Sequence, residues 1–151
     1  MHEQNTFMTI AVNQSKVAMA FFLEGEVVDW EISEKASKSP KEARHYIRHW
    51  LSFYCPDLVI TEKLDENFQK GKAAKTIIQH VQAEIELSHI PHQQVPKKQP
   101  YANKYVMAEV LGERFPILAS YVPTPRKVWM PEPRNAILFD AVALGVFSGL
   151  L

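Results

Sequence analysis

Three apolar runs, separated by short polar turns, open the amino-acid sequence. The first covers Phe7–Val12 and stops at Asn13, the second covers residues 16–23, and the third covers residues 26–32 after a turn at Glu24–Gly25. Connections this short join antiparallel neighbours in a sheet. The pattern predicts three antiparallel strands, and a later parallel strand beside the first would place that first strand at the centre of the sheet.

A helix is predicted to begin after Ser39. Ser39 is a favourable N-cap, Pro40 suits the first helical position, and Glu42 completes a capping box. Cys55 and Pro56 end the helix, because proline disfavours helical backbone in the residue before it. The apolar positions fall on one face at helical spacing: Ala43, Tyr46, Ile47, Trp50, Leu51 and Tyr54.

A short β-branched segment, Leu58–Glu62, has no polar alternation until its end. This is typical of a strand buried on both faces in a parallel sheet, and the helix before it suits a crossover connection. The order of elements predicts one α/β three-layer domain over residues 1–151, with a mixed sheet. The later elements are a helix over 72–88, an edge strand over 89–95, a helix over 101–114 with Tyr105, Val106, Val110 and Leu111 inward, an ordered proline-rich loop over 115–133, and an apolar helix over 134–149.

Composition and charge narrow the class of protein. Hydrophobic residues make up 46% and charged residues 23%, and 17 basic residues balance 17 acidic ones. This balance does not favour a strongly basic nucleic-acid binder but allows a local basic face. The single cysteine, Cys55, indicates a reducing compartment, and its apolar neighbours predict a buried thiol. No signal segment opens the sequence, and residues 136–151 are shorter than a membrane span of about 20 residues, so we expect a cytoplasmic protein.

Three polar residues in apolar settings are candidates for chemistry. Asp140 interrupts a helix that is apolar all round, where a carboxylate needs a cation or a hydrogen-bond donor. Glu62 and Asn13 each end a strand of the predicted sheet, and ligands bind beyond the carboxyl ends of parallel strands. Taken singly, Asp140 could bond a buried hydroxyl, Glu62 could open a polar loop, and Asn13 could serve the turn. Together, their oxygen atoms would suit Mg²⁺ or Mn²⁺.

Three segments resemble the ribonuclease H-like superfamily, and most closely the Holliday junction resolvases of the RuvC type. Residues 9–15, TIAVNQS, resemble the first-strand motif, in which a hydrophobic run leads into an aspartate and a turn. Residues 56–62, PDLVITE, resemble the fourth strand and its glutamate, and residues 139–145, FDAVALG, resemble the final-helix motif. The order of elements resembles the family over nearly the whole chain.

The resemblance implies a ribonuclease H-like three-layer fold, with a five-stranded mixed sheet of three antiparallel strands followed by two parallel ones. It implies hydrolysis of phosphodiesters by two metal ions about 3.5–4 Å apart. It also implies a homodimer that acts on branched or structured DNA. On this resemblance Glu62, Asp140 and Asn13 are the catalytic and metal-binding positions.

Two departures from the family pattern weaken the expected metal site. Asn13 stands where the family has its first aspartate, and an amide is a poorer ligand for a hard cation. Ile137 stands where many resolvases have a second acid in the final helix. Glu62 and Asp140 remain, so a site with one ion rather than two, or binding without cleavage, becomes an alternative. Glu132 and Asp65 are candidates for replacement ligands.

Basic residues near the predicted site are candidates for contacts with DNA phosphates. Single lysines are more often ordinary solvated residues. His45 and His49 are predicted to be solvent-facing, and His89 and His92 are predicted to be structural. The candidate phosphate contacts are Lys70, Lys72, Lys75, Lys97, Lys98, Lys104, Arg126, Lys127 and Arg134.

Three functions compete at this point. The first is a metal-dependent nuclease of the resolvase type. The second is a ribonuclease H-like module that binds nucleic acid or a protein partner with little or no catalysis. The third, a fragment of a protein of the sugar-kinase and actin type, is disfavoured because the sequence lacks the glycine-rich phosphate loops of such proteins and has only 151 residues for two lobes.

Overall fold

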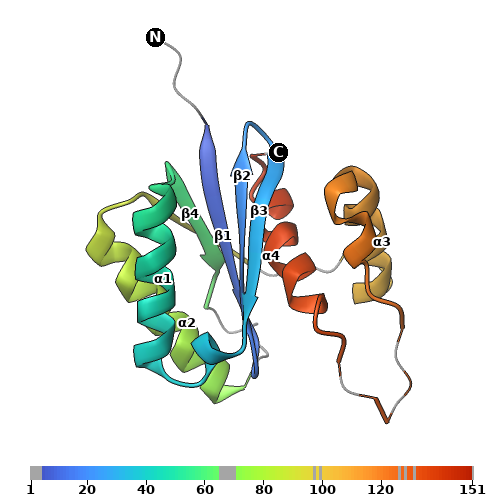
Figure 1. Cartoon of the computed structure of the whole chain (residues 1–151), viewed down its shortest axis with the longest axis horizontal. Helices are drawn as coiled ribbons and strands as arrows, with labels where there is room; N and C mark the ends of the chain where they lie inside the picture. Colours follow the sequence, from blue (N-terminus) through green and yellow to red (C-terminus); the bar gives the residue numbers. More distant parts are fainter. Residues whose placement is uncertain are drawn as a thin grey trace.

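A computed structural model of the protein describes residues 5–64, 71–96, 98, 100–125, 127, 129, 130 and 132–150. Within these ranges, five strands form one mixed sheet in the order β3-β2-β1-β4-β5 (Figure 1). The strands are β1 (Thr6–Val12), β2 (Val17–Leu23), β3 (Glu26–Ser33), β4 (Leu58–Glu62) and β5 (His92–Val95). The first three pair in antiparallel fashion, and β4 and β5 add in parallel, so the predicted sheet is confirmed.

Helices cover both faces of the sheet and make three layers (Figure 1). The helices α1 (Pro40–Tyr54) and α2 (Lys72–Ser88) lie on one face, and α4 (Ala136–Phe147) lies on the other. Outside α4 lies α3 (Lys104–Arg114), followed by the 3₁₀ turn η2 (Pro116–Tyr121); a shorter 3₁₀ turn, η1 (Lys35–Ser37), precedes α1. In the part of the chain that is described, no helix is both long and apolar enough to span a membrane.

Alternation along β1 divides the core into two halves, as expected for a central strand. Phe7 and Ala11 face α4, whereas Met8, Ile10 and Val12 face α1 and α2. Both sets are almost completely buried. Beyond the buried Thr9 the strand is apolar on both sides, and the next polar side chain is that of Asn13, just past its end.

The final helix lies very close to the sheet. Gly145 faces the stacked rings of Phe7 and Phe22, whose centroids are 4.5 Å apart. A Cβ atom at position 145 would lie 3.1–3.3 Å from carbon atoms of both rings. The small residues Ala18, Ala20 and Ala141 belong to the same core.

The helix starts follow capping chemistry. The predicted start of α1 is confirmed, because the Ser39 hydroxyl accepts a hydrogen bond from the backbone N–H of Glu42 at 3.2 Å. The helix predicted from residue 101 begins instead at Lys104, because the Asn103 side chain caps the N–H groups of Tyr105 and Val106. The last helix spans Ala136–Phe147 rather than residues 134–149.

Three further expectations require correction. The buried positions of α3 are Met107, Ala108, Leu111 and Gly112, whereas Val110 is exposed. The proline-rich segment contains a 3₁₀ turn over Pro116–Tyr121. Cys55 is exposed, because it is the left-handed C-cap of α1 and its side chain does not reach the core.

Candidate functional site

Two of the predicted residues lie at the carboxyl ends of neighbouring parallel strands. Glu62 is the last residue of β4, and Asn13 follows the last residue of β1. Ile10 pairs with Thr61, so Glu62 is level with Ala11, and Asn13 lies just beyond. Ile60 belongs to the core half beneath α4, and side chains alternate along a strand, so Glu62 projects towards that face too. Topology brings the two positions to one edge of the sheet.

Asp140 approaches the same face from α4. The helix runs away from the carboxyl edge of the sheet, because Arg134 before it contacts the end of β3 and Gly145 packs on Phe7 near the start of β1. Asp140 therefore lies nearer the carboxyl edge than Gly145 does. Its neighbours Phe139 and Ala141 are buried, and Asp140 itself is half-buried. The prediction of a buried apolar helix with one acidic residue is confirmed.

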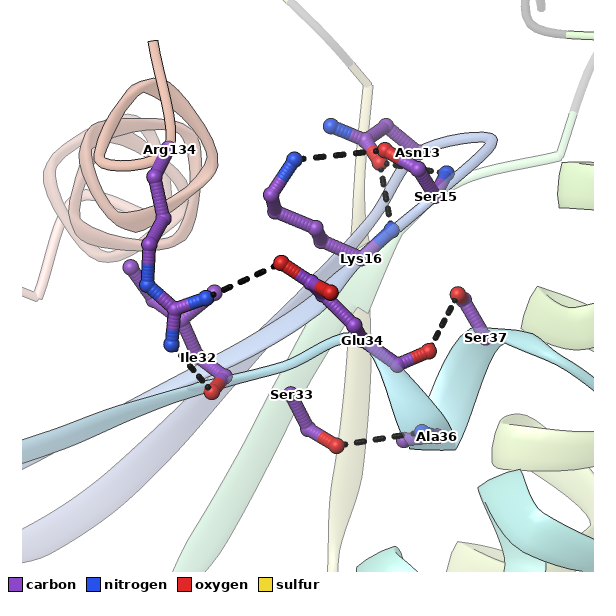
Figure 2. Close-up of polar contacts among 9 residues, drawn as sticks. All are labelled: Asn13, Ser15, Lys16, Ile32, Ser33, Glu34, Ala36, Ser37 and Arg134. Atoms are coloured by element: carbon purple, nitrogen blue, oxygen red, sulfur yellow. Dashed lines mark hydrogen bonds and ion pairs between the residues drawn. The ribbon is translucent and has the colours of Figure 1, made fainter.

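Asn13 shapes the turn between β1 and β2 (Figure 2). Its side-chain Oδ1 accepts hydrogen bonds from the backbone N–H groups of Ser15 at 2.9 Å and Lys16 at 2.8 Å. The backbone N–H of Asn13 in turn donates to the Lys16 carbonyl at 3.0 Å. This is an Asx-type turn, in which an asparagine side chain replaces a backbone acceptor. The turn role considered from the sequence is therefore present.

Glu62 is held by a network on the far side of β4. The Nε2 group of Gln82 on α2 donates to the Glu62 carbonyl and to the Thr61 hydroxyl, both at 3.2 Å. The Thr61 hydroxyl also lies 2.7 Å from Nε2 of His92 on β5. Burial lowers the pKa of His92, and the nearby Glu86 opposes that effect. Sequence reasoning missed Gln82, which has no distinguishing signal among the glutamines of an amphipathic helix.

Charged side chains line the same edge of the sheet on the α4 side (Figure 2). Arg134 donates to the Ile32 carbonyl at 3.3 Å and forms an ion pair with Glu34 at 3.2 Å. Lys16 follows the Asn13 turn, and its ammonium group lies 3.4 Å from the Ser15 hydroxyl. Lys16 was missed from the sequence, because it was counted only as the first residue of a strand. Arg134 was predicted and lies at this edge.

The remaining basic candidates are spread along the chain. Lys72 and Lys75 are exposed on α2, and Lys98 is exposed after β5. Lys104 forms an ion pair with Glu132 at 2.6 Å, so Glu132, the candidate replacement metal ligand, has a lysine partner. Lys127 lies 5.3 Å from the ring centroid of the exposed Trp129, in a cation–π contact. The predictions for Lys70, Lys97, Arg126 and Asp65 fall outside the described residues.

The carboxylates of the predicted site meet the needs of a divalent metal only in part. Over the described ranges, no group of three or more His, Cys, Asp or Glu side chains is placed to hold a metal ion. Two of the predicted carboxylates remain, that of Glu62 at the end of β4 and that of the half-buried Asp140 on α4. Two carboxylates suit one Mg²⁺ that keeps several waters, whereas a two-ion site needs more ligands. His45 and His49 are exposed on α1.

The fold is similar to that of solved resolvases, whereas the sequence alone finds no relative. No protein-family model matches the sequence. No curated protein sequence matches it either. Thermus thermophilus RuvC is similar in structure, with a TM-score of 0.65 and 12% identity over 95% of this chain and 93% of that chain. The fowlpox virus resolvase in complex with substrate Holliday junction DNA has a TM-score of 0.62 and 17% identity over 97% and 99%.

A third similar structure is T. thermophilus RuvC in complex with a Holliday junction substrate, with a TM-score of 0.58 and 10% identity over 95% of this chain and 92% of that chain. These similarities cover nearly the full length on both sides. At identities this low, the likeness is one of fold. The protein has the ribonuclease H-like fold found in RuvC and in the poxvirus resolvase.

Proposed function

We propose that this protein is a metal-dependent, structure-specific nuclease that acts on branched DNA. One observation supports this most strongly: Glu62 ends a parallel strand at the carboxyl edge of a ribonuclease H-like sheet and projects towards the face covered by α4, the helix that carries Asp140. Structures with this fold include RuvC and the fowlpox resolvase in complex with Holliday junctions. In open sheets with parallel strands, this edge is where ligands bind.

Glu62 and Asp140 would hold one Mg²⁺ or Mn²⁺. When bound, such an ion supplies a water of lowered pKa and stabilises negative charge on a phosphate. The protein's part is to fix the two carboxylates. Gln82 and the buried strand β4 fix the backbone of Glu62, and the packing of α4 on Phe7 and Phe22 fixes the helix of Asp140.

Basic residues would place the DNA backbone over this edge. Arg134 lies at the end of β3, and Lys16 lies beside the Asn13 turn. Phosphate contacts of this kind set the position and register of the nucleic acid and carry no sequence information. Lys72, Lys75 and Lys98 are exposed and would extend the contact. Homodimer formation, which the resemblance implies, stays a prediction that sedimentation of the protein with and without a four-way junction tests.

The test is a cleavage assay on a labelled four-way DNA junction and on matched linear duplex, with Mg²⁺ or Mn²⁺. We expect the junction to be cut, and Glu62→Gln and Asp140→Asn each to abolish cutting while circular dichroism stays unchanged. Glu109→Gln on the exposed side of α3 is the matched control, because it removes one carboxylate away from this edge. Cleavage that survives both site substitutions would show that these carboxylates are not the catalytic groups.

The second candidate is a module that binds branched DNA without cutting it. The hydrogen bonding of Asn13 favours this candidate, because its side-chain oxygen is already used by the turn. Junction binding in gel shift or anisotropy measurements, with no cleavage under any metal or substrate, would select it over the nuclease.

A further inference from the structure

The side-chain oxygen of Asn13 has no acceptor capacity left. An amide oxygen has two lone pairs, and here they receive the N–H groups of Ser15 and Lys16 at 2.9 and 2.8 Å. The flipped side chain would point its NH₂ group at two N–H donors, so the hydrogen bonds identify which terminal atom is the oxygen and which is the nitrogen. Nδ2, with its two hydrogens, therefore points away from the turn (Figure 2).

An aspartate in the same turn would behave differently. One carboxylate oxygen would accept the two backbone N–H groups, and the other would remain for a cation. Asn13 has an N–H donor at the position of that second oxygen, and a donor repels a cation. The residue that resembles a metal ligand in the sequence thus cannot serve as one without breaking the turn.

A hydrogen-bond donor at this edge of the sheet suits an anion. Thr9, Ala11 and Asn13 alternate to the face that α4 covers, and the Lys16 ammonium and the Arg134 guanidinium lie on the rim beside this turn (Figure 2). Glu34 partly neutralises Arg134 in an exposed ion pair. Lys16 adds a positive charge beside the turn, because its backbone N–H donates to Oδ1 of Asn13 and its ammonium group lies 3.4 Å from the Ser15 hydroxyl (Figure 2).

We propose that Asn13 binds a phosphate oxygen of the nucleic-acid backbone through its Nδ2 group, with Lys16 as the accompanying charge. The ligand class is a phosphodiester, and the contact forms without a metal ion at this position. This inference rests on the nucleic-acid partner of the proposed function and not on cleavage. It changes the role of Asn13 from metal ligand to hydrogen-bond donor to a phosphate oxygen.

The test substitution is Asn13→Asp, which keeps the oxygen that caps the turn and replaces the donor with a negative oxygen. Binding of a fluorescent four-way DNA junction is measured by anisotropy in EDTA and again in Mn²⁺. In EDTA we expect Asn13→Asp to weaken binding about tenfold, because a donor to phosphate becomes a repelling charge. In Mn²⁺ we expect the variant to recover binding and to bind additional Mn²⁺, which electron paramagnetic resonance counts directly.

The matched control is Asn103→Asp. Asn103 caps α3 with the same geometry, since its Oδ1 accepts from Tyr105 and Val106 at 2.9 and 3.0 Å, and it is exposed. The control tests the effect of one added negative charge in a capping turn, and we expect less than about a twofold change in EDTA. Thermal unfolding of both variants checks that each turn survives.

The outcomes separate the inference from the proposed function. Equal affinity of wild type and Asn13→Asp in EDTA would overturn the phosphate contact, even if the wild type cuts DNA. A tenfold loss for Asn13→Asp would support it, even if no variant cuts any substrate. A wild-type protein that binds no nucleic acid would overturn both.

Discussion

The side-chain Nε2 of Gln82 on α2 donates a hydrogen bond to the main-chain carbonyl of Glu62 at 3.2 Å. The same nitrogen donates to the Thr61 hydroxyl, which also shares a hydrogen bond with Nε2 of His92, 2.7 Å away. Thr61 and Glu62 project to opposite faces of β4. A contact made on the α2 side of the sheet therefore fixes the backbone of a carboxylate on the α4 side.

Replacing Gln82 with Leu should weaken the proposed metal site and the fold together. The substitution leaves the carbonyl of the buried Glu62 without this donor, and we expect a loss of about 1–3 kcal/mol in the free energy of unfolding. Mn²⁺ affinity, measured by calorimetry on the folded protein, should also fall. Gln79→Leu on the exposed side of α2 is the control and should change neither quantity. Unchanged Mn²⁺ affinity in Gln82→Leu would show that the network is purely structural.

His92 should make stability depend on pH near neutrality. Burial lowers the pKa of His92 below its ordinary value of 6.5, so the unfolded chain takes up the proton first as pH falls. The contribution of His92 to the free energy of unfolding is therefore complete above pH 6.5, and it is lost as the pH falls through the lower pKa of the folded state. Urea unfolding measured from about pH 7.5 downwards should show decreasing stability, and His92→Gln should flatten that part of the curve. The same slope in His92→Gln would assign it to other groups.

The sheet could be predicted because its signals are local. Short turns after Val12 and Leu23 left only antiparallel pairing for the first three strands, and the unbroken apolar run of β4 required burial on both faces. The start of α1 could be predicted in the same way, because its signals, Ser39, Pro40 and Glu42, lie next to one another in the sequence.

The site was less predictable because its contacts depend on geometry between distant segments. Asn13, Glu62 and Asp140 could be selected as polar residues in apolar settings, but their hydrogen bonds could not. The Gln82 contact spans 20 residues, and the Arg134 contact with Ile32 spans 102. The start of α3 was displaced for a different reason: Asn103 is a strong N-cap that the polar loop around it concealed.

Glu84 should make a second, more acidic contribution to the pH dependence of stability. It is almost completely buried between α1 and α2, where Arg48 contacts it at 3.0 Å and Arg44 at 3.4 Å. The hydrogen bond from Arg48 is the main cause that lowers the pKa of Glu84 below 4.5. The stabilisation is therefore present above pH 4.5 and is lost as pH falls through the folded pKa. Urea midpoints from about pH 6 to about pH 3 should fall in the wild type and less in Glu84→Gln.

Glu84→Gln should also reduce stability at neutral pH, because it leaves Arg44 and Arg48 with a neutral partner. Glu86→Gln, on the exposed side of the same helix, serves as the control. Parallel pH curves for the wild type and Glu84→Gln would show that the ion pairs contribute nothing to acid sensitivity.

Gly145→Ala should loosen the packing of α4 on the sheet. The added Cβ would lie 3.1–3.3 Å from carbon atoms of Phe7 and Phe22, and both rings are buried and stacked on each other, so neither can move aside. Packing strain of about 1–3 kcal/mol opposes a gain in helix propensity of about 1 kcal/mol, so we expect net destabilisation near 1 kcal/mol. Asp140 lies on this helix and would shift with it, so any cleavage activity should fall as well.

Gly71→Ala is the matched control, because its Cβ would meet only the end of the exposed Gln14 side chain at 3.2 Å. Thermal unfolding of the two variants decides the point: a Gly145→Ala protein as stable as the wild type would mean that the aromatic pair yields, and that α4 is held less tightly than these contacts indicate.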